Sequence, residues 1–232
     1  PGPPGPPHAG RPPRRLHPHR GRLWRGLHHP HPGRAVGGGL PAPREPSNDP
    51  FPHEARPHDP IGRAMAYRFT EAGADLELVD INTHGLNAVN KELAQFKHEV
   101  NIHKVDISSR EAINSLWEEL SGREPDILAN NAGIYPFKNF LEMDEAFFKR
   151  VMDINLQSTL LMCQQMIRRR LRKGGVIINI GSIEAIMPFA EGLVAYDISK
   201  TGVIGLTRGL AKEYGRHGFR INVILPGGIV TP

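Results

Sequence analysis

Two side chains one helical turn apart could transfer a proton. Three residues separate Tyr196 from Lys200 in a stretch with helical apolar spacing, so both side chains lie on one helix face. A free tyrosine has a pKa of about 10 and exchanges protons poorly at neutral pH. A neighbouring ammonium group favours the phenolate, so the pair predicts a tyrosine whose pKa is lowered for acid–base chemistry. In isolation, this spacing more often marks an aromatic core residue beside a solvated lysine.

A serine upstream changes that interpretation. Ser182 follows Gly181 and the run 176–180, which is apolar on both faces. Such a run is typical of a central parallel strand covered by helices, and ligands of these sheets bind at the carboxyl ends of the strands. Ser182 precedes Tyr196 by 14 residues, enough for a loop to pass over a substrate. The alternative role for Ser182 is a helix cap.

From residue 61 onward, helical patterns alternate with short apolar strands. We expect helices over 61–72, 86–96, 109–120, 144–172 and 195–214, and strands over 76–79, 102–105, 126–129, 176–180 and 221–225. Gly73 is placed to end the first helix and Ser109 to begin the third. Gly202, Gly205 and Gly209 are expected to permit close helix packing. The alternation predicts an α/β fold, a doubly wound parallel sheet of Rossmann type.

Five short motifs, in this order and spacing, resemble the short-chain dehydrogenase/reductase (SDR) family over residues 61–232. They are Asn130-Asn131-Ala132-Gly133, Asp153-Ile154-Asn155-Leu156, Ser182, Tyr196-Asp197-Ile198-Ser199-Lys200, and Pro226-Gly227-Gly228-Ile229-Val230-Thr231. The chain is most similar in kind to 3-oxoacyl-acyl-carrier-protein reductases and to glucose or alcohol dehydrogenases. The resemblance implies an NAD(P)-dependent oxidoreductase that interconverts a secondary alcohol and a ketone by hydride transfer.

The resemblance also implies catalytic roles. Tyr196 acts as general acid in reduction and general base in oxidation, while Lys200 lowers its pKa and binds the nicotinamide ribose. Ser182 donates a hydrogen bond to the substrate oxygen, so that Ser182 and Tyr196 both bind substrate. Asn155 interrupts its helix and holds a water that links Lys200 to solvent. The alternative for Asn155 is a polar residue that faces solvent.

A carboxylate at the end of the strand 76–79 bears on the choice of cofactor. Asp80 lies 18 residues after Gly62, where it can accept hydrogen bonds from ribose hydroxyls and repel a 2′-phosphate, which favours NAD over NADP. Its alternative role is a turn cap. The resemblance implies further cofactor contacts at Gly62, Ile81, Asp106, Ile107, Asn130, Ala132, Gly133, Tyr196, Lys200, Pro226, Gly227, Ile229 and Thr231.

The first sixty residues differ in composition from the rest. They hold 17 of the 22 prolines, eight of the 12 histidines and nine arginines without a lysine, so we expect disorder. One interpretation is a genuine tail, in which Pro3-x-x-Pro6 offers a polyproline ligand. Another is a metal site at His28-His29-Pro30-His31, which lacks acid or cysteine partners. The favoured interpretation is a GC-rich reading frame that is not the native one.

The family's opening strand and its loop Thr-Gly-x-x-x-Gly-x-Gly have no clear counterpart. Glu54 to Gly62 occupy this position, and only Ile61-Gly62 match the end of the loop. Pro57 and Pro60 lack amide donors, and Asp59 places negative charge where phosphates would bind. We therefore expect weak NAD binding, unpaired strand edges and an incomplete sheet. The family's segment beyond Thr231 is also absent. The competing functional hypothesis is a non-catalytic, degenerate Rossmann-type interaction protein with a Pro/Arg-rich tail.

Charge and cysteine usage narrow the range of partners. The net charge of +5 belongs to residues 1–60, because residues 61–232 carry 20 basic and 20 acidic side chains. The folded part therefore gives no argument for nucleic-acid binding. We expect a cytoplasmic protein without a membrane span or metal site, in which the single cysteine, Cys163, is a buried structural thiol. The resemblance implies a small-molecule alcohol, ketone or acyl-carrier substrate and, in the intact family member, a homodimer or homotetramer.

Overall fold

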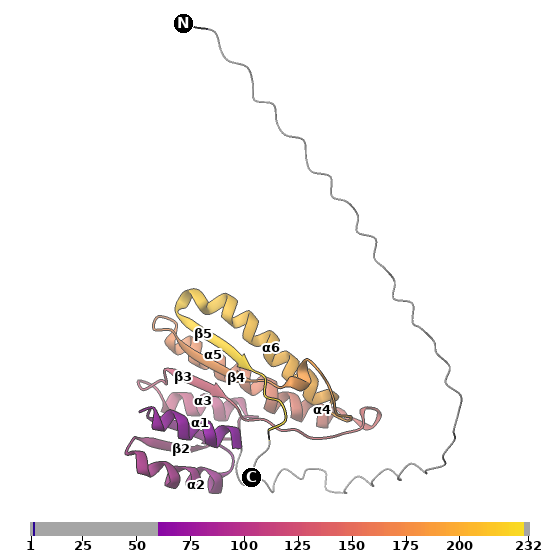
Figure 1. Ribbon diagram of the computed structural model, residues 1–232, viewed down its shortest axis with the longest axis horizontal. Helices are drawn as coiled ribbons and strands as arrows, with labels where there is room; N and C mark the ends of the chain where they lie inside the picture. Colours follow the sequence, from indigo (N-terminus) through magenta and orange to yellow (C-terminus); the bar gives the residue numbers. More distant parts are fainter. Residues whose placement is uncertain (1, 3–59, 230–232) are drawn as a thin grey trace, which may run out of the picture. The chain divides into compact units, whose positions relative to one another are not determined.

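Helices and short parallel strands alternate from residue 60, as the sequence predicts (Figure 1). The computed structural model describes Gly2 and residues 60–229, and all its elements belong to the unit Ser47–Pro232. The predicted tail, apart from Gly2 and Pro60, lies outside the described residues. The same holds for the His28–His31 cluster and for Thr231.

The helices are α1 (Pro60–Glu71), α2 (Thr83–Leu93), α3 (Arg110–Glu119), α4 (Glu145–Met152), α5 (Ser158–Arg170) and α6 (Val194–Tyr214). The strands are β1 (Leu76–Asp80), β2 (Val100–Lys104), β3 (Ile127–Asn130), β4 (Gly175–Ile180) and β5 (Phe219–Ile224). Short 3₁₀ turns are η2 (Ala94–Phe96), η3 (Phe140–Glu142), η5 (Ile183–Ala185) and η6 (Gly215–His217), and η4 (Asp153–Gln157) is a π-helix.

Two expected helix ends have the predicted geometry. Gly73 adopts φ +94°, and its N–H donates to the carbonyl of Thr70 at 2.9 Å, which ends α1. The hydroxyl of Ser109 accepts a hydrogen bond from the N–H of Ala112 at 3.1 Å, which begins α3. Pro60 stands at the first position of α1, where its missing N–H costs nothing. The predicted helix end at Gly73 and the predicted helix start at Ser109 are therefore confirmed.

The strands form two parallel sheets rather than one. β1 pairs with β2, and β4 lies between β3 and β5. In the doubly wound order 3-2-1-4-5, the first strand lies between those that correspond to β1 and β3. Among the described residues no strand occupies that position, so β1 and β3 each leave one edge unpaired, as expected. The expectation of an incomplete parallel sheet with unpaired strand edges is confirmed, and the break divides the strands into two sheets (Figure 1).

Each sheet has its own covering helices. α1 packs on β1, and α2 packs on both β1 and β2. α5 and α6 pack on the three-stranded sheet, and α3 packs on α5. The main core lies between α3, α5 and the strands β3 to β5. Its members are Ile113, Trp117, Leu128, Leu161, Cys163, Met166, Ile167, Ile177, Phe219 and Ile221.

Cys163 is a structural thiol, as predicted. Its side chain is 1% exposed. Burial raises the pKa of this thiol to about 12, although hydrogen bonds with Asn130 and Asn179 act in the opposite direction. A thiol that stays protonated at neutral pH is a poor nucleophile.

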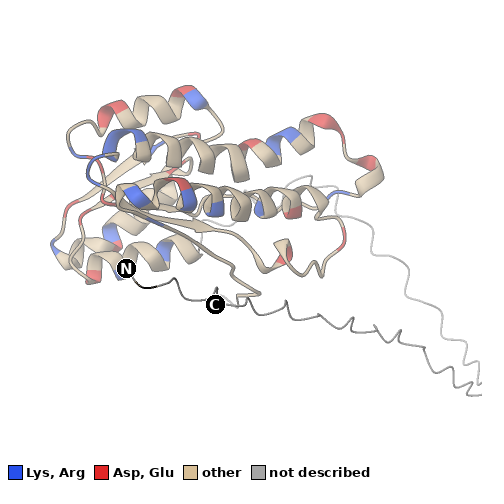
Figure 2. Cartoon of the chain, turned by 90° about the horizontal axis from the view of Figure 1, so that it is seen from above, with Lys and Arg blue, Asp and Glu red and all other residues tan. Residues whose placement is uncertain are grey.

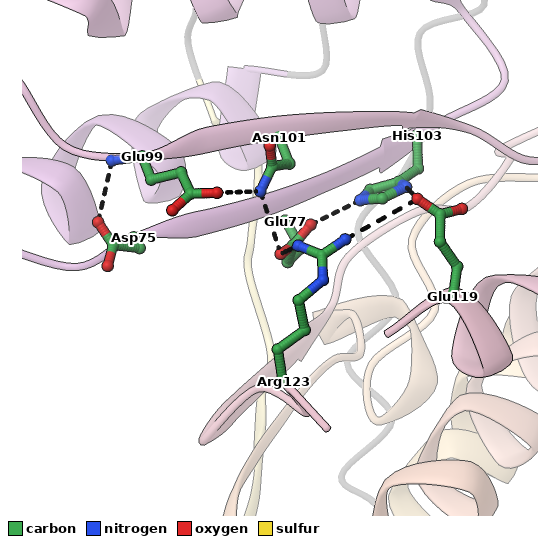
Figure 3. A network of polar contacts seen from close by, with 7 residues as sticks. All are labelled: Asp75, Glu77, Glu99, Asn101, His103, Glu119 and Arg123. Atoms are coloured by element: carbon green, nitrogen blue, oxygen red, sulfur yellow. Dashed lines mark hydrogen bonds and ion pairs between the residues drawn. The ribbon is translucent and has the colours of Figure 1, made fainter. Parts of the chain in front are cut away.

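A polar network joins the β1–β2 sheet to the loop after α3 (Figure 3). The carboxylate of Glu77 lies 2.6 Å from His103 Nε2 and also accepts from Asn101 and Arg123. His103 is 8% exposed, and its Nδ1 lies 3.3 Å from Glu119, the last residue of α3. Because the two sheets share no strand pairing, this network is one of the contacts that connect them.

Removal of the Glu77 carboxylate should therefore destabilise the fold. Glu77→Ala is expected to lower the free energy of unfolding by about 1–3 kcal/mol, because His103 and Arg123 lose an acceptor in a partly buried position. Urea unfolding followed by circular dichroism measures the change. Glu92→Ala is the matched control, since Glu92 pairs with Arg63 on the surface and should contribute less than about 1 kcal/mol. Equal losses in both variants would contradict the proposed link.

The surface charge of the described residues is mixed. Figure 2 shows blue and red residues interspersed along the helices and the connecting loops. Such a surface has no large field of one sign to steer a polyanion. Among residues 60–229, no helix combines the length and apolar character needed to cross a membrane.

Candidate active site

Ser182 is fixed where β4 ends. Close packing at Gly181 sets its position, since an added Cβ there would lie 2.5 Å from the side chain of Leu225. Ser182 then caps the short turn η5, and its Oγ accepts a hydrogen bond from the N–H of Glu184 at 3.2 Å. The serine is 8% exposed. Both of its predicted positions, strand end and cap, therefore hold at once, and the cap fixes the oxygen at the mouth of the sheet.

Tyr196 and Lys200 come to this serine from the first two turns of α6. The side chain of Ser182 interacts with the Tyr196 hydroxyl, and this interaction lowers the pKa of the phenol. The Nζ of Lys200 lies 5.7 Å from the centre of the Tyr196 ring and donates to the carbonyl of Ile180 at 2.8 Å. Lys200 is 5% exposed. The structure thus brings the three predicted residues together at the carboxyl end of β4.

The pKa of Tyr196 shifts opposite to the expected direction. Burial raises it above the usual tyrosine value, the hydrogen bond from Ser182 lowers it, and the charges of Glu184 and Asp197 raise it further. Lys200 directs its ammonium group at the Ile180 carbonyl rather than at the phenol oxygen. The expectation of a lowered pKa is therefore wrong for this structure, and the phenol stays protonated at neutral pH.

Asn155 lies inside the π-helix η4, where the predicted helix 144–172 is interrupted between α4 and α5. Its amide makes two bonds to the backbone of Ile134, accepting from the N–H at 2.8 Å and donating to the carbonyl at 2.9 Å. It also donates to the hydroxyl of Ser199 at 3.1 Å and is 1% exposed. Asn155 therefore joins the loop after β3 to α6. The alternative of a solvent-facing residue is wrong.

The loop after β3 approaches Lys200 closely. A Cβ added at Gly133 would lie 3.2 Å from Asn155 Oδ1 and 3.5 Å from Lys200 Nζ. Ala132 and Gly133 are exposed, which leaves their backbone accessible. The side chain of Asn130 instead turns inward and donates to Asn179 at 2.8 Å. Asn130 thus contributes to the packing of β3 against β4.

Close packing also holds α6 against η4. A Cβ at Gly202 would meet the side chain of Leu156 at 2.6 Å, so the glycine permits the contact that we expected. A Cβ added at Gly205 or Gly209 would have no neighbouring atom within 4 Å, so for these two glycines the expectation of close packing is wrong. Gly202 is therefore the glycine that brings the Tyr196 helix onto the Asn155 segment.

The predicted adenosine contacts lie at the ends of β1 and β2. Asp80 accepts a hydrogen bond from the N–H of Asn82 at 2.8 Å, so it also fills the alternative role of a turn cap. Ile81 is 61% exposed, whereas Ile107 packs against the core. A pocket of about 390 Å³ opens beside Ile81 and Asp106. Its other lining residues are Ser108, Ala146, Lys149, Arg150, Asp153 and Ile154.

The other residues that were predicted to contact the cofactor lie on different elements. Gly62 lies in the first turn of α1. Pro226 follows β5, and its carbonyl accepts from the N–H of Ile183 at 3.0 Å, which holds this segment beside Ser182. Gly227 and Ile229 are exposed. In residues 60–229 no cluster of three or more His, Cys, Asp or Glu side chains could hold a metal ion.

Of two further neighbours of Tyr196, Tyr135 was not predicted as a site residue, whereas Glu184 was expected to line the substrate side as part of the segment 183–194. Tyr135 packs edge-on against Tyr196, with ring centres 4.6 Å apart. Its hydroxyl donates to Glu184, whose carboxylate is buried. An aromatic residue two positions after Asn130–Gly133 was the available signal for Tyr135. For Glu184, only its position two residues after Ser182 marked it.

Comparison with known proteins agrees with this geometry. The family model for enoyl-(acyl carrier protein) reductase matches residues 57–232. The chain is 35% identical over 178 residues to 3beta-hydroxysteroid dehydrogenase 2 of Eggerthella lenta, covering 74% of the chain and 67% of that protein. It is 35% identical over 176 residues to 3-oxoacyl-(acyl-carrier-protein) reductase FabG of Aquifex aeolicus, covering 74% and 70%. The chain belongs to the short-chain dehydrogenase/reductase family, whose members are oxidoreductases.

Solved structures give the same result. Levodione reductase superimposes with a TM-score of 0.69 at 33% identity, covering 72% of this chain and 67% of that one. A 4-hydroxyisoleucine dehydrogenase complexed with NADH and succinate gives 0.65 at 32% identity, covering 72% and 74%. The chain thus spans about two thirds of the length of the proteins it matches, and its Rossmann-type α/β fold is that of the family.

Proposed function

We propose that this chain is an NAD(P)-dependent oxidoreductase that interconverts a secondary alcohol and a ketone. The observation that carries the proposal is that Ser182, Tyr196 and Lys200 meet at the carboxyl end of β4, with the ammonium group of Lys200 5.7 Å from the centre of the Tyr196 ring. This is the place where open α/β sheets bind their ligands. A purely structural helix would not need a buried lysine beside a half-buried phenol.

The residues present fit a dinucleotide at two of three positions. Asp80 and the pocket beside Ile81 suit the adenosine end, while the exposed backbone of Gly133 beside Lys200 suits the nicotinamide ribose. The pyrophosphate position corresponds to residues 54–60, where Pro57 and Asp59 are unfavourable for an anion. When bound, the reduced nicotinamide supplies the hydride.

The side chains supply the proton and stabilise charge. In ketone reduction, the protonated Tyr196 gives its hydroxyl proton to the carbonyl oxygen of the substrate. Ser182, whose oxygen accepts from the N–H of Glu184, keeps its proton and donates a hydrogen bond to the same substrate oxygen. The ammonium group of Lys200 stabilises the negative charge that remains on the phenol oxygen. Oxidation of the alcohol reverses these transfers.

The proposal includes a substrate class and a setting. The substrate is a small ketone or alcohol, free or carried as an acyl group, in a cytoplasmic protein. Self-association through α5 and α6 is supported by Leu160 and Ile198, which are 41% and 45% exposed on those helices.

A chain with a restored phosphate loop tests the activity. In this loop-repaired chain, residues 1–60 are replaced by the first strand and the Thr-Gly-x-x-x-Gly-x-Gly loop of the Aquifex aeolicus reductase. We expect ketone-dependent loss of NADH absorbance with at least one member of a panel of aliphatic, cyclic and acyl-carrier ketones. Firm NADH binding without turnover of any panel member would favour a non-catalytic Rossmann-type protein instead.

Asp80 should set the choice between the two cofactors. In the loop-repaired chain, Asp80→Asn is expected to lower the ratio of the NADPH to the NADH dissociation constant by about tenfold or more, because it removes a charge that repels the 2′-phosphate. The asparagine oxygen can still accept from the N–H of Asn82. Fluorescence titration with each cofactor measures the ratio. Asp75→Asn serves as the control, and an equal change in both variants would refute the role of Asp80.

A further inference from the structure

Glu184 is a buried carboxylate that the proposed reaction does not use directly. It is 1% exposed and lies in η5, two residues after Ser182. One oxygen accepts from the hydroxyl of Tyr135 at 3.4 Å, and the other accepts from the N–H of Phe189 at 3.0 Å. Burial of a carboxylate is costly unless hydrogen bonds compensate it, so these contacts are needed for its position.

Each partner of Glu184 belongs to a different wall of the site. Tyr135 packs on Tyr196, and Phe189 lies in the segment 186–192 between Ser182 and α6. The carbonyl of Gly192 accepts from the N–H of Lys138 at 2.9 Å, so this segment is also joined to the loop after β3. Glu184 itself holds the oxygen of Ser182 through its N–H. The carboxylate of Glu184 thus connects Tyr135 with the segment 186–192, and the backbone of the same residue contacts Ser182.

We propose that Glu184 is a positioning residue, which fixes Tyr135 and the segment 186–192 around Tyr196 and places a negative charge beside the two phenols. The titratable groups that feel its charge are Tyr135 after β3, and Tyr196 and Asp197 on α6. This inference rests on the proposed function for its chemical meaning. Its test, however, needs neither cofactor nor turnover.

Two substitutions at Glu184 separate the effect of its charge from the effect of its contacts. Burial, followed by the charge of Glu184, raises the pKa of Tyr135 to about 12, and the same two causes raise the pKa of Asp197. In Glu184→Gln, the amide oxygen can accept from Phe189 and the amide nitrogen can donate to the hydroxyl of Tyr135. This variant removes the charge and keeps the contacts. Glu184→Ala removes both.

Tyrosine-resolved NMR of the full chain gives the first readout. With ¹³C at the ring carbon that bears the hydroxyl, Glu184→Gln is expected to raise the acid dissociation constants of Tyr135 and Tyr196 about three- to tenfold, the effect of losing one nearby negative charge. The titration curves of Tyr67 in α1 and Tyr214 at the end of α6 are internal controls. Unchanged curves for Tyr135 and Tyr196 would overturn the charge role.

Hydrogen exchange gives the second readout. The Phe189 amide is expected to exchange about tenfold faster or more in Glu184→Ala, and at nearly the parent rate in Glu184→Gln. A folded Glu184→Ala variant with parent-like exchange at Phe189 would overturn the positioning role. In the loop-repaired chain, Glu184→Gln should also move the alkaline fall of kcat/KM for reduction to lower pH. A drop in activity with an unmoved profile would mean a structural role only, whereas absence of turnover in every variant would count against the proposed function alone.

Discussion

Tyr196→Phe in the loop-repaired chain is expected to lower kcat for ketone reduction by about 10²–10⁴-fold. The phenol lies beside Ser182, and its raised pKa keeps it protonated, which is the form that donates to a carbonyl oxygen. Phenylalanine keeps the ring that packs against Tyr135 but cannot donate. The change should therefore affect kcat far more than NADH affinity, and initial rates at saturating NADH measure it.

The pH dependence of the reduction rate follows from the phenol of Tyr196. Because reduction uses the protonated phenol, its rate should be level below the raised pKa of Tyr196 and fall as pH rises through it. Oxidation of the alcohol uses the phenolate, so its rate should rise over the same pH range. Tyr214→Phe, at the far end of α6, is the control and should leave the rate unchanged. A Tyr196→Phe variant that retains the parent kcat within a few fold would remove Tyr196 from the mechanism.

Restoring the phosphate loop is expected to strengthen NADH binding by about 10²-fold or more. In the chain as it stands, Pro57 and Pro60 supply no N–H groups and Asp59 adds negative charge near the start of α1. A glycine loop instead presents backbone N–H groups, and the dipole of the helix, to the pyrophosphate. We expect the present chain not to saturate at micromolar NADH and the loop-repaired chain to do so, as followed by NADH fluorescence.

A second replacement separates the loop from the strand that precedes it. A repaired chain whose three loop glycines are alanines should fold with the added strand between β1 and β3 but bind NADH no better than the present chain. Micromolar affinity in the present chain would show that residues 54–60 accommodate the phosphates after all. In that case the proposed defect is wrong, and the cofactor site is complete without repair.

Local patterns were sufficient to predict most of the elements. Alternating apolar periods located α1 to α6 and β1 to β5 to within a few residues, and Gly73 and Ser109 ended and began their helices as predicted. The motif residues Ser182, Tyr196 and Lys200 could be paired because parallel strands and the following helices bring their carboxyl-terminal loops to one edge. These features depend on residues near one another in the sequence.

Other features depend on contacts that the sequence does not display. Apolar spacing predicted 144–172 as one helix, and only the family resemblance implied the interruption at Asn155, because a single π turn is too short to change the apolar pattern. The sign of the Tyr196 pKa shift depends on its burial and on Glu184, whereas the sequence showed only Lys200. The inward turn of Asn130 depends on Asn179, which is 49 residues away. In each case tertiary packing decides the outcome.

The most direct test of the central claim follows the hydride and the proton together. The loop-repaired chain is given NADH with deuterium at the transferable position of the nicotinamide, and a ketone that it reduces. The account predicts an alcohol with deuterium on the carbinol carbon, and loss of this product in Tyr196→Phe and in Ser182→Ala. An unlabelled alcohol, or labelled alcohol formed at the parent rate in both variants, would contradict it.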